Sequence, residues 1–160
     1  LVDICEGLIV IASFVLGWLY QLNNKYIVGL NDVLSDRLKY IAQTMSTYNI
    51  KLWGQYIEEH GNGGSIIAKD NYFFIDNSFV RCMYEYGAIV FVLVIVLIFM
   101  AQKKMLDNEK YIMCLAFFIV TIASFAEHHL LEIAYNPFIF SVFACMSNND
   151  KVIMEEKRIC

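Results

Sequence analysis

Three uncharged apolar blocks, spread along a chain of only 160 residues, most constrain what this sequence can fold into. They cover residues 7–22, 87–101 and 111–126. A bilayer core about 30 Å thick needs roughly 17–25 residues of helix, so the first and third blocks reach that length when their flanks are included. One such block is compatible with a buried core helix, but three of them leave too little polar sequence to cover their surface.

The composition also favours a membrane protein. Hydrophobic residues make up 59% and charged residues 18% of the chain, whereas soluble domains have about 45–50% and about 25%. We therefore predict an all-α, multi-pass transmembrane helical protein with a structured, partly helical extracytoplasmic loop.

The predicted segments follow the apolar blocks. Transmembrane helices are expected at 1–22, 87–101 and 111–126, and the apolar stretch 130–146 is either a fourth span or, because Pro137 interrupts it, a broken or re-entrant segment. The remaining segments are a long loop at 23–86, a short loop at 102–110, a turn at 127–129 and a tail at 147–160.

The orientation follows from basic residues close to the ends of the spans. Lys103, Lys104 and Lys110 lie in the short loop, and the tail adds Lys151, Lys157 and Arg158. Lys and Arg near span ends favour the cytoplasm, so we place the short loop and the tail inside and the long loop outside. The turn at 127–129 then also lies outside.

Several other classes of function are not expected. The five cysteines show no paired spacing, so neither a disulfide framework nor a cysteine zinc site is predicted. Adjacent residues of a helix point in different directions, so His128 and His129 do not predict a metal site. No cofactor is predicted, and a net charge of −4 without a basic stripe speaks against a nucleic-acid partner. Because the chain opens on Leu1 next to a span, we expect it to be the C-terminal portion of a longer protein.

The long loop carries a helical pattern. Apolar residues recur at steps of four, three, four and three, at Leu34, Leu38, Ile41, Met45 and Tyr48. This spacing predicts an amphipathic helix, with Asn31 or Asp32 as its N-cap. Arg37 and Tyr40 share another face of that helix.

Two further features of the loop concern its local shape. The glycine-rich stretch 61–64 lacks a following Lys-Ser or Lys-Thr pair, so it predicts a loop tip and not a phosphate-binding loop. Asp76 or Ser78 is placed to cap a helix that continues into the second span.

The order of short motifs resembles a family. The motifs are Ser35-Asp-Arg-Leu38, Tyr48-Asn-Ile-Lys-Leu-Trp-Gly54, Ile75-Asp-Asn-Ser-Phe-Val80, Glu85-Tyr-Gly-Ala-Ile89, and Ser124-Phe-Ala-Glu127 followed by Tyr135-Asn-Pro-Phe138. This series is similar to that of the Wzy-type polysaccharide polymerases, within the O-antigen polymerase and ligase superfamily of membrane glycosyltransferases. Asp76 stands where ligases usually carry His, which favours a polymerase, and Asp36 stands where Gly or Asn is commoner.

The resemblance implies an activity and partners. Such enzymes join oligosaccharide repeat units carried on undecaprenyl diphosphate, at the outer face of the bacterial plasma membrane, into a capsule or O-antigen polysaccharide. The implied partners are the lipid-linked oligosaccharide and the bilayer, with a flippase and a chain-length regulator protein as further candidates. A ligase-like transferase and a non-enzymatic flippase or transporter subunit are the alternatives.

The resemblance also selects candidate site residues. Arg37 is the candidate ligand of the leaving diphosphate, because a guanidinium binds phosphate with two parallel hydrogen bonds. Asp76 is the candidate general base and Glu127 a third catalytic candidate. The candidate substrate contacts are Asn77, Arg81, Tyr40 and His128. Asn77 could instead cap a helix, and Arg81 could instead lie among the lipid headgroups.

Overall fold

The computed structural model describes residues 2–60, 72–132 and 136, and this part of the chain is mostly helical. Its elements are α1 (Val2–Gln21), α2 (Lys25–Val33), α3 (Arg37–Thr47), α4 (Ser78–Arg81), a π-helical turn η2 (Cys82–Tyr86), α5 (Ala88–Asp107), α6 (Tyr111–Ala123) and a 3₁₀ turn η3 (His129–Leu131). Within these residues no strand occurs, and the backbones of His60 and Phe73 form one isolated antiparallel bridge. The predicted helical class is therefore confirmed for the described part.

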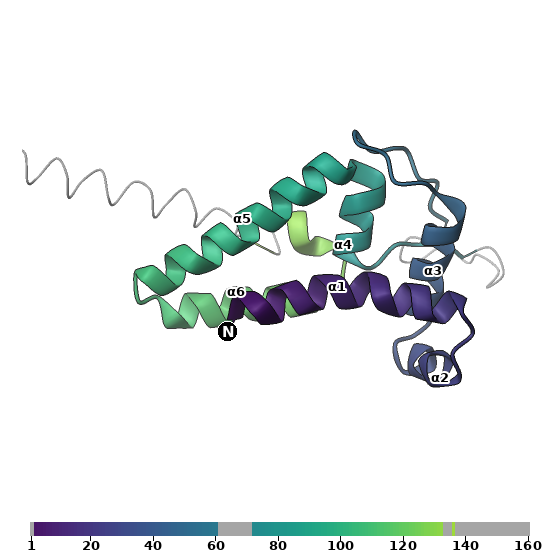
Figure 1. The fold of residues 1–160 in the computed structure, drawn as a ribbon, viewed down its shortest axis with the longest axis horizontal. Coiled ribbons are helices and arrows are strands. Elements are labelled where there is room, and N and C mark those ends of the chain that lie inside the picture. The colour runs from purple at the N-terminus through teal and green to yellow at the C-terminus, as the bar shows by residue number, and fades with distance from the viewer. Residues whose placement is uncertain (1, 61–71, 133–135, 137–160) are drawn as a thin grey trace, which may run out of the picture.

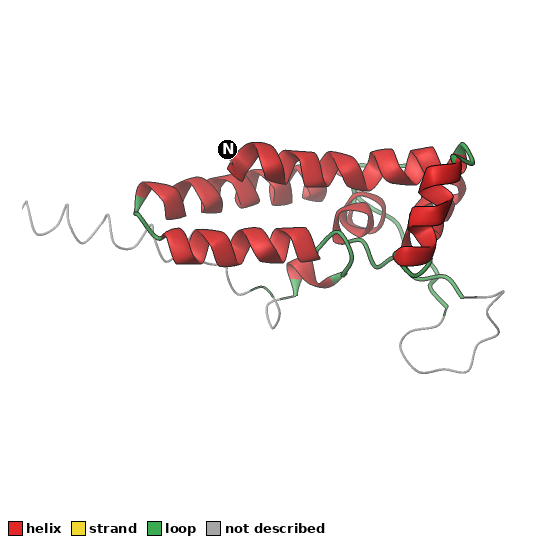
Figure 2. Cartoon of the chain, turned by 90° about the horizontal axis from the view of Figure 1, so that it is seen from below, coloured by secondary structure: helices red, strands yellow, loops and turns green. Residues whose placement is uncertain are grey.

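Three long helices run alongside one another. α5 and α6 form an antiparallel pair joined by a tight turn at 108–110, and α1 packs against both (Figures 1 and 2). α1 begins beside α6, whereas α2 and α3 lie at the opposite end of α1 (Figure 1). The described part of the long loop and the α5–α6 turn therefore lie at opposite ends of the helices.

Two of these helices are long and apolar enough to cross a membrane. They are the stretches Ile4–Gln21 of α1 and Ala88–Asp107 of α5. α6 is apolar but has only 13 residues, which at 1.5 Å per residue is about 20 Å and less than a bilayer core. The multi-pass prediction thus rests on two helices of spanning length within the described residues.

The interior consists of two adjoining clusters of buried side chains. One joins α5 to α6 and includes Ile98, Met105 and Phe117; the other lies under α3 and includes Leu38, Ile41 and Ile75. α4 is shared between them, because Phe79 is buried in the first cluster and its neighbour Val80 in the second. This short helix therefore links the apolar helices to the loop.

The long loop differs in detail from its predicted form. Asn31 and Asp32 do not cap α3, because they belong to α2, a helix that the sequence pattern did not predict. The N-cap is Asp36, whose φ of 66° is left-handed and whose side chain makes no capping hydrogen bond. Asn31 of α2 provides a capping hydrogen bond instead, because its Oδ1 accepts from the backbone N of Lys39 at 3.0 Å. Its Nδ2 donates to the Asp36 side chain at 2.8 Å.

The approach to α5 also differs from the prediction. The cap of α4 is Asn77 and not Asp76 or Ser78. The helix does not run on into the span, since Gly87, with a φ of 99°, separates η2 from α5. The N–H groups of Ala88 and Ile89, which have no partner within the helix, instead donate to the carbonyls of Lys51 and Leu52, at 3.0 and 3.3 Å. Backbone from the long loop thus caps α5.

Some predicted boundaries shift, and others cannot be compared. α5 continues to Asp107, so Lys103 and Lys104 lie on its last turns and not in a loop. The glycine-rich stretch 61–64, most of the predicted segment 130–146 and the tail 147–160 lie outside the described residues.

Candidate functional site

The structure brings together the three residues proposed as catalytic, although they lie far apart in the sequence. Arg37 is the first residue of α3, Asp76 precedes the cap of α4, and Glu127 follows α6. Nε of Arg37 lies 3.5 Å from Oδ2 of Asp76, and its Nη2 lies 3.4 Å from Oε1 of Glu127. The guanidinium is therefore held between two carboxylates.

The charges and exposure of this triad define what it can do. The side chains of Arg37 and Asp76 are 29% and 24% exposed, and that of Glu127 is 50% exposed. Burial raises the pKa of Asp76, the Arg37 guanidinium opposes this, and the negative charge of Glu127 adds to it. A partly desolvated carboxylate with a raised pKa is a stronger base than an exposed Asp. The arrangement therefore combines an anion-binding guanidinium with a candidate proton acceptor.

The turn that carries Glu127 is fixed by Ser78. The Ser78 hydroxyl donates to the carbonyl of Glu127 and accepts from the backbone N of Leu130 at 3.2 Å. The backbone N of Ser78 donates to the carbonyl of Ser124 at 2.9 Å. The start of α4 thus holds the chain that follows α6, whereas the sequence pattern indicated only a helix cap at Ser78.

Asn77 lies next to the triad but its amide is used inside the protein. Its Oδ1 accepts from the backbone N of Phe79 and Val80, at 3.0 and 2.9 Å. Its Nδ2 donates to Ser13 of α1 at 3.0 Å and to the carbonyl of Phe125 at 2.8 Å. The side chain is 1% exposed, so these contacts favour the capping alternative over a sugar contact.

We expect Asn77→Ala to destabilise the protein. The change removes a helix cap, worth ~0.5–2 kcal/mol, and leaves the Ser13 hydroxyl and the Phe125 carbonyl without their partner, at about 1–3 kcal/mol for a buried group. The thermal unfolding midpoint of the purified protein in detergent measures this loss. Asn24→Ala is the matched control, because Asn24 caps the exposed α2 through the backbone N of Tyr26 alone. Equal losses for the two variants would contradict the linking role of Asn77.

Arg81 takes part in an internal ion-pair network. Its guanidinium contacts Glu59 at 2.5 Å and Glu85 at 3.3 Å, and its Nε donates to the carbonyl of Ile75 at 3.1 Å. It also lies 4.9 Å from the centre of the Phe74 ring. These contacts connect the 51–60 segment to η2. Because the guanidinium of Arg81 is paired inside the protein, the contacts favour neither a lipid headgroup nor a phosphate as its partner. Glu59, the closest partner of Arg81, lies in none of the sequence motifs.

Tyr40 lies beneath the site. Its ring is buried in the cluster under α3 and packs against Tyr72, with ring centres 5.3 Å apart. Burial, followed by the charge of Asp36, raises the pKa of its hydroxyl. The residue therefore supports the loop around Asp76 by packing.

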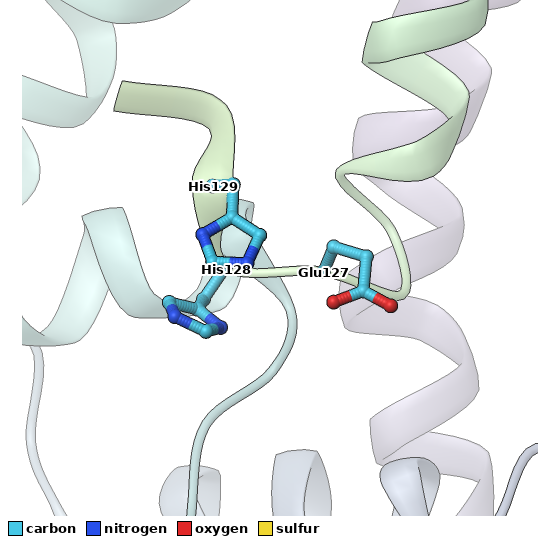
Figure 3. Close-up of side chains that lie close together, drawn as sticks. All are labelled: Glu127, His128 and His129. Atoms are coloured by element: carbon cyan, nitrogen blue, oxygen red, sulfur yellow. The ribbon is translucent and has the colours of Figure 1, made fainter. Parts of the chain in front are cut away.

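His128 and His129 lie together, contrary to the expectation that they point apart. Their ring centres are 3.9 Å apart, and Figure 3 shows both imidazoles beside each other with the Glu127 carboxylate to one side. The expectation assumed that both residues belong to one helix. α6 ends at Ala123, and His128 (φ −87°, ψ 8°) lies outside η3 as its N-cap.

Glu132 completes this group and was not selected from the sequence. Its Oε1 lies 2.9 Å from Nδ1 of His129 and 3.6 Å from Nε2 of His128. Its spacing of three and four residues from the two histidines is the signal that could have identified it. Burial, followed by the charge of His129, lowers the pKa of His128, which favours its neutral form.

No protein-family model, no curated protein and no solved structure matches this chain. A proposal about its activity therefore depends on the geometry of the described residues and on the motif resemblance.

Proposed function

We propose that this chain is part of a multi-pass membrane glycosyltransferase that polymerises undecaprenyl diphosphate-linked oligosaccharide repeat units on the outer face of a bacterial plasma membrane. The observation that carries the proposal is the contact of Arg37 with both Asp76 and Glu127. The motif resemblance selects these three residues from three separate stretches of sequence, and unrelated surface residues would not be expected to meet.

The proposed reaction assigns one role to each member of the triad. The Asp76 carboxylate takes the proton of an acceptor sugar hydroxyl, whose oxygen forms a bond to the anomeric carbon of the donor glycan. The bond from that carbon to the diphosphate breaks, and undecaprenyl diphosphate leaves with the electron pair. Arg37 neutralises the charge that develops on the leaving group. Because two carboxylates already neutralise Arg37, the diphosphate must take the place of the more exposed Glu127.

Exposed apolar side chains support a membrane location. Large hydrophobic residues project from α1, α5 and α6, among them Leu8, Ile11, Trp18, Val92, Leu93, Val96, Ile112, Leu115 and Ile119. In water so many exposed apolar side chains would favour aggregation, whereas the acyl chains of a bilayer can cover them. The long loop at the far end of α1 then lies outside the apolar region.

Accessibility labelling tests this topology. In a background without native cysteines, we expect Glu58→Cys in intact cells to react with a membrane-impermeant maleimide, because the Glu58 side chain is 69% exposed in the long loop. Asn108→Cys, in the exposed α5–α6 turn, should react only after the membrane is permeabilised. The opposite pattern would invert the topology and move the proposed site into the cytoplasm.

The activity itself is tested with a purified lipid-linked repeat unit. The full-length protein in vesicles should convert single repeats on undecaprenyl diphosphate into a ladder of longer glycans on the same lipid. Transfer of finished glycan to a different acceptor would identify a ligase. Movement of the lipid across the vesicle membrane with no change in glycan length would identify a transporter.

The pH dependence of polymerisation reports on Asp76. A general base acts when deprotonated, so activity is lost as the pH falls through its pKa. Burial raises this pKa above the ordinary 3.8, and the acid limb of the pH–rate profile should lie correspondingly higher. Glu127→Gln removes a negative charge that raises the pKa, so it should move the limb to lower pH. An acid limb at or below the ordinary pKa of an Asp carboxyl, 3.8, would exclude Asp76 as the base.

A further inference from the structure

Two overlapping sets of metal-binding side chains lie where the chain leaves α6, and both contain His128 and His129. One ligand atom each of Glu127, His128 and His129 lies within 4.8 Å of the others (Figure 3). Glu132 approaches the same two imidazoles, at 2.9 Å from His129 and 3.6 Å from His128. Two imidazoles and two carboxylates thus share one short segment of the chain.

These separations fit a tetrahedral ion. Zinc bonds of about 2.0–2.2 Å to imidazole nitrogen and carboxylate oxygen place neighbouring ligand atoms about 3.3 Å apart. The two distances from Oε1 of Glu132 lie on either side of that value. Glu127 requires a larger adjustment, which its half-exposed side chain can make by changing rotamer, with loss of its contact to Arg37.

The backbone of this segment is held from outside the cluster. Ser78 bonds to the Glu127 carbonyl and to the Leu130 backbone N, and Leu130 is 1% exposed in the core. The His128 ring packs edge-on against Phe74, with ring centres 5.1 Å apart. Fixed ligands are the condition for tight and selective metal binding.

Two separate cavities border the ligand group. His128 and Glu132, together with Arg81, line a cavity of about 100 Å³. His129 and Glu127 line a second cavity of about 180 Å³ against the end of α6. A bound ion would therefore have access from solvent.

We propose that His128, His129, Glu132 and Glu127 bind a divalent transition-metal ion of the zinc class. Imidazole nitrogen together with carboxylate oxygen selects Zn²⁺, Co²⁺ or Ni²⁺ over Mg²⁺ and Ca²⁺, which prefer ligand sets made of oxygen alone. The inference goes beyond the proposed glycosyl transfer. Glu127 belongs both to this group of ligands and to the Arg37 triad, but metal binding is measured without the activity assay, so the two proposals can fail separately.

Metal content is the direct test. The full-length protein, purified in detergent and stripped with EDTA, should take up a single equivalent of Zn²⁺ that survives gel filtration. Co²⁺ added in its place should give the intense visible absorption of a tetrahedral site. Wild-type protein that retains no Zn²⁺ and gives only the weak spectrum of hydrated Co²⁺ would overturn the proposal, whatever the variants do.

Variants locate the site. His128→Ala and His129→Ala should each weaken Zn²⁺ binding at least about tenfold, by analogy with the ~10–100-fold losses on removal of groups outside the first ligand sphere. Glu132→Gln should weaken it more than Glu127→Gln, since Glu132 lies nearer both imidazoles. His60→Ala, at an exposed histidine of the long loop, should leave binding unchanged.

The folded state of each variant is read from its thermal unfolding midpoint without metal. His129→Gln, which keeps a polar side chain of similar size, replaces His129→Ala if the latter unfolds. Unchanged Zn²⁺ binding in folded His128→Ala and His129→Ala would show that any ion binds elsewhere in the protein and would overturn the assignment.

Discussion

Replacing Arg37 by alanine is expected to lower the turnover of glycan polymerisation ~10²–10³-fold. This is the loss found when an enzyme loses one hydrogen-bond donor that stabilises negative charge in the transition state. Single lipid-linked repeats should accumulate instead of polymer. Arg37→Lys keeps the positive charge but loses the planar, two-pronged geometry, so it should restore little activity. The measurement is polymer length and rate in vesicles, at equal amounts of protein in the membrane.

This loss should not arise from unfolding. Arg37 is paired with two carboxylates that are 24% and 50% exposed, and ion pairs of this kind contribute only ~0–1 kcal/mol. Lys39→Ala is the control, because Lys39 is an exposed cation on the same helix whose ammonium lies 5.6 Å from the centre of the Tyr40 ring. Equal effects of Arg37→Ala and Lys39→Ala would remove Arg37 from the mechanism.

The helices that the sequence predicted best are those whose pattern is long and uniform. α1 and α5 follow directly from uncharged apolar runs, and α3 follows from apolar steps of three and four. α2 was missed because it has only nine residues and several of its apolar side chains, such as Tyr26 and Val33, are exposed. Its position depends on Asn31 contacting α3, which is a tertiary interaction.

The sequence selected candidate residues for the site but did not predict the contacts between them. Motif resemblance selected Arg37, Asp76 and Glu127, yet local patterns carry no information on contacts between residues that are 90 positions apart, as Arg37 and Glu127 are. Two supporting contacts were missed for the same reason, since Ser78 and Glu59 act through segments that meet only in the folded chain. Glu132 lies three residues from His129, so its spacing could have identified it.

Two motifs of the long loop turn out to form one structural unit. The turn that ends at Gly54 lies against Gly87, the residue before α5, and Gln55 N donates to the carbonyl of Glu85 at 3.0 Å. Gly54 and Gly87 have φ values of 81° and 99°, which glycine adopts readily and other residues rarely do. The unit caps α5 and connects to Arg81 through Glu85. The unit therefore links the start of α5 to the ion-pair network around Arg81.

Gly87→Ala is accordingly expected to be among the most damaging single substitutions in the described chain. At φ 99° and ψ 165° the backbone occupies a region reached essentially by glycine alone, and a side chain there costs ~1–3 kcal/mol. The new Cβ would also overlap backbone atoms of Leu52 and Gly54 and lie 2.8 Å from the carbonyl carbon of Trp53. If the 51–55 segment moved away from α5 to relieve this overlap, the hydrogen bonds donated by Ala88 and Ile89 would break, at ~1 kcal/mol each.

Together these terms reach about 3 kcal/mol or more, a large part of the 5–15 kcal/mol that stabilises a typical domain. We therefore expect little monodisperse Gly87→Ala protein after extraction in detergent, and a lowered unfolding midpoint in what remains. Gly29→Ala is the matched control, since a Cβ there meets nothing within 4 Å and Gly29 lies inside α2. Alanine favours a helix over glycine by ~0.5–1 kcal/mol, so this variant should be as stable as the wild type or slightly more so. Wild-type yield and midpoint for Gly87→Ala would show that the 51–55 segment does not cap α5 in the membrane.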